Sequence, residues 1–180
     1  MVYIFLADGF EEIEALTPYD ALKRAEIEVS FVGVNKLEVV GAHGIKVTAD
    51  ILENQVDFNK MTAVVLPGGM PGTLNLEKSQ MVNQAIDYAN KNNLLIGAIC
   101  AAPSILGKKG LLKNKKAICY PGFENELQGA LLSDETVVCD ENIITAKGAG
   151  VNWEFSLAII AYLKDDNTAC QLAESLQCRK

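Results

Sequence analysis

The chain has 180 residues, 49% of them hydrophobic, and a formal net charge of −7 at pH 7. This length suits a single buried core, and we expect residues 1–180 to form one domain. The negative charge argues against a nucleic-acid-binding surface, and no apolar run is long enough to cross a membrane. Five cysteines without a CxxC pair indicate reduced thiols in the cytoplasm and predict neither a disulfide framework nor a zinc site.

The first third of the chain alternates apolar strands with a helical pattern. Residues 2–7 predict a buried strand, and the apolar spacing that follows predicts a helix carrying Ile13 and Leu16. Pro18 lies inside this pattern and is expected to kink or break the helix, because proline removes a backbone hydrogen bond. Further strands are predicted at residues 29–34, 37–40, 45–49 and 61–66, the middle two as a hairpin or an edge pair.

The rest of the chain continues the alternation of strands and amphipathic helices. Such a pattern predicts a mostly parallel sheet covered on both faces. We therefore expect an α/β fold, a three-layer sandwich of the flavodoxin-like kind. The last helix is expected to bury Ala169, Leu172, Ala173 and Leu176. The other predicted elements are helices at residues 80–92 and 152–163 and strands at residues 117–119, 136–139 and 143–146.

Residues 94–104 carry the pattern of a nucleophile elbow with a cysteine at the turn. An apolar strand ends at Cys100 among small residues, and a short helical segment follows. The first N–H groups of that segment point at the side chain, so the pKa of the thiol is expected to be lowered. The alternative is a buried structural cysteine. Ligands of parallel sheets bind beyond the carboxyl ends of the strands, where the segments holding Glu14 and Gly69 also fall, and this favours a functional Cys100.

Several motifs occur in the order typical of one known family, over nearly the whole chain. They are GFEEIE at residues 9–14, VLPGG at 65–69, AICAAP at 98–103, ITAKGAG at 144–150 and EFSLAI at 154–159. With these motifs the chain resembles the ThiJ/PfpI family, and within it the branch of the Parkinson-disease protein deglycase and its bacterial relatives. The resemblance is highly specific for the fold and less specific for the activity.

The resemblance implies roles for individual residues. Cys100 matches the family nucleophile, and Glu14 matches the glutamate that hydrogen-bonds this thiol, typically as a protonated acid. A buried Glu14 with a raised pKa could serve as general acid and base. The amides of Gly69 and Ala101 match the family's oxyanion hole, and Gly68 belongs to the same substrate-binding loop.

The sequence also departs from the family pattern at its histidines. Ala101 stands where the protease-like branch has a histidine, and Tyr120 stands where a deglycase of the family has another. The one histidine of the chain is His43, so a Cys–His triad and peptidase activity are poorly supported. Tyr120 and Cys119 are expected near the pocket, Cys119 either as a second redox thiol or as an inert packed side chain.

The implied function is a cofactor-independent cysteine enzyme acting on 2-oxoaldehydes such as methylglyoxal, or on their adducts with proteins. Cys100 would form a hemithioacetal and Glu14 would shuttle a proton. The alternatives are an oxidative-stress sensor or chaperone through Cys100 oxidation and, third, an intracellular cysteine peptidase or amidase. Glu11 and Glu12 are interpreted as carboxylates that favour the first turn of a helix. The family is commonly dimeric, so a homodimer is expected, and the chemistry requires no metal.

Overall fold

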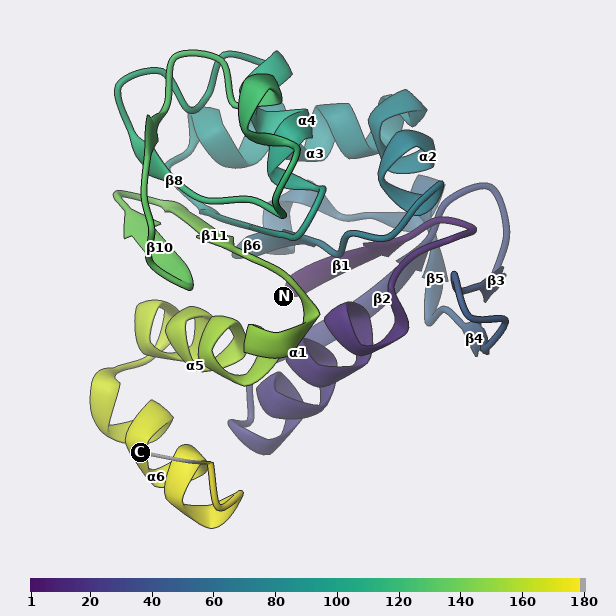
Figure 1. Ribbon diagram of the computed structural model, residues 1–180. Helices are drawn as coiled ribbons and strands as arrows, with labels where there is room; N and C mark the ends of the chain where they lie inside the picture. The colour runs from purple at the N-terminus through teal and green to yellow at the C-terminus, as the bar shows by residue number, and fades with distance from the viewer. Residues whose placement is uncertain (179–180) are drawn as a thin grey trace.

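The computed structural model describes residues 1–178, and its centre is a seven-stranded sheet (Figure 1). In spatial order the strands are β10 (Val137–Asp140), β11 (Ile143–Ala146), β7 (Leu95–Ile99), β6 (Ala63–Leu66), β1 (Val2–Leu6), β2 (Val29–Gly33) and β5 (Ile51–Leu52). All neighbours are parallel except β10 and β11. Without the edge strands β5 and β10, this is the strand order of a flavodoxin-like fold. The predicted mostly parallel α/β fold is confirmed.

Helices cover both faces of the sheet, which gives three layers (Figure 1). On one face α1 (Glu12–Arg24) packs against α5 (Asn152–Leu163), and α6 (Asp166–Ser175) packs against α5. The other face carries α2 (Gly72–Lys78), α3 (Gln80–Lys91) and α4 (Pro103–Lys108). Within residues 1–178, no helix combines the length and the apolarity that a bilayer span requires.

The central strand β1 shows how the sequence produces these layers. Tyr3 and Phe5 belong to the apolar cluster beneath α2, α3 and α4, whereas Ile4 and Leu6 belong to the cluster beneath α1 and α5. All five residues of β1 are buried. A parallel strand covered on both faces needs a continuous apolar run rather than alternation, and residues 2–6 supply one.

Two small sheets flank the main one. β3 (Glu38–Val40) pairs with β4 (Lys46–Thr48) as an antiparallel hairpin, which confirms the predicted hairpin. β8 (Lys116–Ala117) pairs in parallel with β9 (Leu131–Leu132). The strands β5 and β9 and the helix α2 were not predicted, because two-residue strands and a seven-residue helix are too short to show a period.

Helix α1 differs from its prediction in two respects. It runs unbroken through Pro18, so the expected break is absent. Its predicted apolar positions Ile13 and Leu16 are 50% and 36% exposed, whereas Glu12 and Glu14 are buried. The reason is that the start of α1 faces the ends of the strands, where its carboxylates find hydrogen-bond donors.

Helix α6 buries less than its apolar spacing predicts. Ala169 is buried, but Leu172, Ala173 and Leu176 are only half-buried. The prediction of a fully buried face was therefore wrong for three of four positions. The physical reason is that α6 packs on α5 and not on the sheet, so its apolar side is covered by one neighbour.

Candidate active site

Cys100 lies at a sharp turn between β7 and α4. Its φ of 64° falls in the left-handed region, which a non-glycine residue adopts only when its surroundings hold it there. The Cys100 N–H donates to the Ala146 carbonyl at 2.9 Å, and the Tyr120 N–H donates to the Cys100 carbonyl at 2.8 Å. The side chain is half-buried. The geometry of the predicted nucleophile elbow is thus present, with Cys100 at its apex.

Glu14 is brought to this turn by the first turns of α1. Its side chain is fully buried, and Oε2 accepts a hydrogen bond from the Gly68 N–H at 2.8 Å. Within residues 1–178, Oε1 has no hydrogen-bond partner. Burial raises the pKa of Glu14 to about 7, although hydrogen bonds from Gly68 and the Cys100 thiol oppose this shift. Both protonation states are therefore populated near neutral pH, as acid–base catalysis requires.

The pKa of the Cys100 thiol is raised to about 12, and the predicted lowering was wrong. Burial is the largest cause, followed by the charge of Glu14 and the hydrogen bond to it. The N–H groups of Gly69 and Ala101 act in the opposite direction but do not outweigh these effects. The prediction considered the helix N-terminus but neither burial nor the charge of Glu14 beside the thiol. Because two causes depend on ionised Glu14, the two groups titrate as a pair.

The loop after β6 approaches both groups closely. A Cβ atom at Gly68 would lie 2.7 Å from the Cys100 Cβ and 2.7 Å from the Glu14 Oε2. Gly69 has a φ of +88°, and a Cβ there would run into the backbone of residues 9–11. The N–H groups of Gly69 and Ala101 both reach the thiol. The structure thus brings together Cys100, Glu14, Gly68, Gly69 and Ala101, the five residues that the resemblance singled out.

Tyr120 and Cys119 have different positions relative to this site. Tyr120 is tied to Cys100 through its backbone, and its 50% exposed side chain lies close to Gly148. Cys119 is 2% exposed and belongs to the apolar cluster beneath α2, α3 and α4. Burial, followed by the charge of Glu124, raises the pKa of its thiol to about 11. These properties favour the interpretation of Cys119 as an inert packed side chain.

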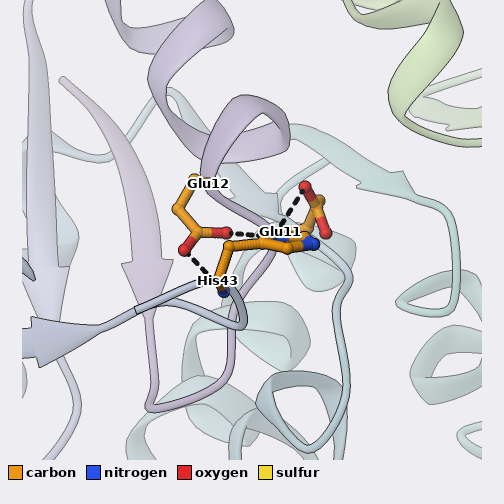
Figure 2. Close-up of side chains that lie close together, drawn as sticks. All are labelled: Glu11, Glu12 and His43. Carbon is orange, nitrogen blue, oxygen red and sulfur yellow. Dashed lines mark hydrogen bonds and ion pairs between the residues drawn. The ribbon is translucent and has the colours of Figure 1, made fainter. Parts of the chain in front are cut away.

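A second group of polar side chains, Glu11, Glu12 and His43, lies beside the start of α1 (Figure 2). Glu12 is 2% exposed, and its Oε1 accepts the N–H groups of His43 at 2.8 Å and Ile45 at 3.3 Å. Its Oε2 lies 2.9 Å from Nδ1 of His43. Burial alone would raise the pKa of Glu12, but the hydrogen bonds from His43 and Ile45 hold it below its ordinary value.

Glu12 therefore connects α1 to the β3–β4 hairpin, a role that its interpretation as a first-turn carboxylate did not include. A Cβ at Gly41 would collide with the Glu12 carboxyl group, so the turn needs glycine there. Glu11 links this group to the loop of the candidate active site, because its N–H donates to the Gly68 carbonyl at 3.0 Å. Sequence reasoning missed the pairing because 31 positions separate Glu12 from His43 and no local pattern connects them.

A separate cleft of about 860 Å³ opens where β1 and β2 end. Residues of α2, of α3 and of the loops after these strands line it, including Asp8, Lys36, Asn75 and Ser79. An ion pair of 2.7 Å joins Lys36 to Asp8. Neither Cys100 nor Glu14 belongs to its lining, so the cleft is distinct from the candidate active site.

Comparison with known proteins decides the family. Residues 1–162 match the model of the DJ-1/PfpI family. The chain belongs to this family. It is 29% identical over 167 residues to the glutathione-independent glyoxalase DJR-1.2 of Caenorhabditis elegans. This alignment covers 92% of this chain and 89% of that protein. It is also 29% identical over 168 residues to a deglycase of Pyrococcus abyssi, covering 91% of this chain and 99% of that protein.

Solved structures of the family have the same fold. The crystal structure of Drosophila melanogaster DJ-1beta superposes with a TM-score of 0.93 at 33% identity and covers 99% of this chain and 98% of that one. Some members are much longer. The match to Protein DJ-1 homolog B of Arabidopsis thaliana, at 34% identity, covers 97% of this chain but 40% of that protein. The family that the motifs indicated is therefore confirmed along almost the entire chain.

Proposed function

We propose that this DJ-1/PfpI protein is a cofactor-independent cysteine enzyme that converts 2-oxoaldehydes such as methylglyoxal to 2-hydroxy acids. The same chemistry on aldehyde adducts of proteins would make it a deglycase. The observation that carries the proposal is the contact between the Cys100 thiol and the buried Glu14 carboxyl group, whose pKa is raised to about 7 by burial. The relatives named as a glyoxalase and a deglycase support this class of reaction.

The first step is addition of the Cys100 sulfur to the aldehyde carbon. A thiol with a pKa of about 12 holds almost no resting thiolate at neutral pH, so ionised Glu14 takes the S–H proton as the C–S bond forms. The carbonyl electron pair moves to the oxygen. The N–H groups of Gly69 and Ala101, whose hydrogen bonds act to lower the pKa of the thiol, would stabilise this oxyanion. Glu14 then protonates the oxyanion and gives a neutral hemithioacetal.

Glu14 also carries the proton of the second step. As a carboxylate it removes the hydrogen from the carbon that bears the sulfur, while the proton of the hemithioacetal hydroxyl group passes through water to the neighbouring ketone oxygen, so that an enediolate forms. Glu14 returns its proton to the former ketone carbon, and the enediolate oxygen becomes the carbonyl oxygen of a Cys100 thioester with a hydroxyl group beside it. Water hydrolyses this thioester, so that aldehyde and water give a 2-hydroxy acid and the free thiol. Oxidation of one carbon balances reduction of the other, and no external oxidant is needed.

The test follows methylglyoxal loss and lactate formation by the purified protein without glutathione. Cys100→Ala and Glu14→Gln are measured beside the wild type, and Cys139→Ala serves as the matched cysteine control because Cys139 is exposed and outside the site. We expect turnover in the wild type and in Cys139→Ala, and loss in both site variants. Turnover retained by Cys100→Ala, or absent from the wild type, would refute the proposal.

A redox sensor or chaperone is the second candidate function. Half-buried Cys100 is reachable, while protonated Glu14 beside it can donate a hydrogen bond to a sulfinate, the oxidised form of the thiol. Intact-mass measurement after mild peroxide treatment separates the candidates. Gain of two oxygens at Cys100 without aldehyde turnover favours the sensor. A peptidase is disfavoured, because the one histidine of the chain is bound to Glu12.

We also propose that the protein is a homodimer of the cytoplasm. Ile13 and Leu16 of α1 are 50% and 36% exposed, and Ile45, on the turn that Glu12 holds, is 53% exposed. Exposed apolar side chains on this helix and on the turn bound to it are suited to a subunit interface. The free cysteines fit a reducing compartment. Sedimentation analysis should give a dimer for the wild type and a monomer for Ile13→Glu.

A further inference from the structure

We propose that Glu11, Glu12 and His43 form a binding site for a divalent first-row transition metal of the Zn²⁺ or Co²⁺ type, separate from Cys100 and Glu14. Figure 2 shows the three side chains facing one another, and each offers one ligand atom within 4.8 Å of the others. One imidazole and two carboxylates suit these ions. Three protein ligands leave one tetrahedral position for water.

The distances between the ligand atoms fit an ion at the centre. His43 Nδ1 lies 2.9 Å from Glu12 Oε2 and 3.6 Å from Glu11 Oε1. Metal–ligand bonds of about 2.0–2.2 Å separate neighbouring ligand atoms in a tetrahedral site by about 3.4 Å. The two observed spacings lie on either side of this value. Rotation of the His43 ring is sufficient to lengthen the shorter distance, from Nδ1 to Glu12 Oε2, because the His43 side chain is 69% exposed.

The most buried ligand is already oriented before an ion arrives. The N–H groups of His43 and Ile45 fix Oε1 of Glu12, which directs Oε2 toward the imidazole. The absent side chain of Gly41 leaves room for the carboxyl group. Hydrogen bonds that hold a ligating carboxylate are a regular part of protein metal sites, and their loss weakens metal affinity. The hairpin turn therefore acts as the support of the site.

The charge of the proposed site and its access to solvent also suit a divalent metal ion. Two carboxylates neutralise the two positive charges of the ion. On binding, Nδ1 releases its proton to solvent and gives its lone pair to the metal, so the metal replaces the proton shared by His43 and Glu12. In the single chain the ion reaches the site past His43, whose side chain is 69% exposed, without opening the core. The imidazole selects against Mg²⁺ and Ca²⁺, which prefer oxygen ligands.

His43 makes the site measurable because it is the one histidine of the chain. The imidazole C–H signals in a proton NMR spectrum report this position alone, even where thiols bind zinc elsewhere. We expect saturable shifts of these signals with Zn²⁺, paramagnetic shifts with Co²⁺ and no change with Mg²⁺ at equal concentration. Cys100→Ala should bind as the wild type does, which separates this site from the candidate active site.

The decisive variant is at Glu11, which is partly exposed. A substitution of Glu12 would also disturb the hairpin that it holds, so a loss of metal binding there would have two explanations. Glu11→Gln should weaken Zn²⁺ binding at least tenfold or so, as loss of metal-site partners commonly does. Glu38→Gln is the matched control, because Glu38 lies on the same hairpin and pairs with Lys46. Two results would overturn the proposal: His43 signals that respond to pH and not to Zn²⁺, or equal affinities of Glu11→Gln and the wild type.

Discussion

Glu12 and Glu14 lie two positions apart on α1, are 2% and 0% exposed, and have opposite pKa shifts. Burial is the largest single effect at both carboxyl groups and raises the pKa of each. At Glu12, hydrogen bonds from His43 and Ile45 outweigh it and lower the pKa. At Glu14, the hydrogen bonds from one N–H group and one thiol do not outweigh burial, and the pKa rises to about 7. Glu14 lies deeper in the protein and has fewer donors, and both differences separate a structural carboxylate from one suited to acid–base chemistry.

The largest expected effect comes from breaking the surroundings of Glu14. Gly68→Ala places a Cβ 2.7 Å from both the Cys100 Cβ and the Glu14 Oε2, so the two reacting groups must move apart. We expect kcat/KM for methylglyoxal to fall by about 100-fold, the effect of a displacement near 1 Å. Gly150→Ala is the control, since nothing lies within 4 Å of the added atom. Equal rates for the two variants would show that close approach of the loop is unnecessary.

The next effect is the pH dependence of stability that Glu14 causes. Its pKa is about 7 in the folded protein and near 4.5 when unfolded, so between these values only the folded state keeps the proton. The free energy of unfolding therefore falls as pH rises from about 4.5 to 7, by roughly 2–3 kcal/mol from this group. Urea unfolding at pH 5 and pH 8, with EDTA present, measures it. Glu14→Gln should lack this component, and an unchanged pH dependence would contradict the raised pKa.

The sequence predicts the parts of this comparison that depend on local pattern. The strand that ends at Cys100 among small residues indicates the elbow, and the family motifs place Glu14 and Gly69 beside it. Continuous apolar runs in the strands indicate a parallel sheet. The elbow and the parallel sheet depend on neighbours along the chain, and the structure confirms both. Glu14 and Gly69 are distant from Cys100 in sequence, and only the family motifs placed them beside it.

The remaining features depend on contacts between distant segments. The raised pKa of Cys100 arises first from burial and then from Glu14, which lies far away in sequence, whereas a helix N-terminus alone suggests the opposite shift. The donors to Glu12 come from a hairpin 31 positions along the chain. Ile13 and Leu16 show helical spacing, yet the position of α1 at the strand ends leaves them exposed. No local pattern contains these relationships.

A smaller effect is expected when the carboxylate of Glu12 is neutralised. Glu12→Gln replaces the charge that receives the His43 and Ile45 N–H groups and places an amide near His43 Nδ1. We expect the free energy of unfolding to fall by about 2 kcal/mol, because hydrogen bonds to charged groups are stronger than neutral ones. Denaturant unfolding beside Glu38→Gln, an exposed carboxylate of the same hairpin, measures it. A variant as stable as Glu38→Gln would mean that the hairpin does not depend on the charge.

The smallest effect is that of His43→Ala, because the ring is largely exposed while the backbone N–H of residue 43 still donates to Glu12. Its hydrogen bond to Glu12, with the charge of Glu11, raises the pKa of His43 above 6.5. The stabilisation from the ring is therefore full below pH 6.5 and is lost as pH rises through the folded-state pKa. With EDTA present, wild type and His43→Ala should differ in unfolding midpoint at pH 6 and coincide at pH 9. A difference that is equal at both pH values would show that the ring acts by packing, and that ionised Glu12 is held by the backbone alone.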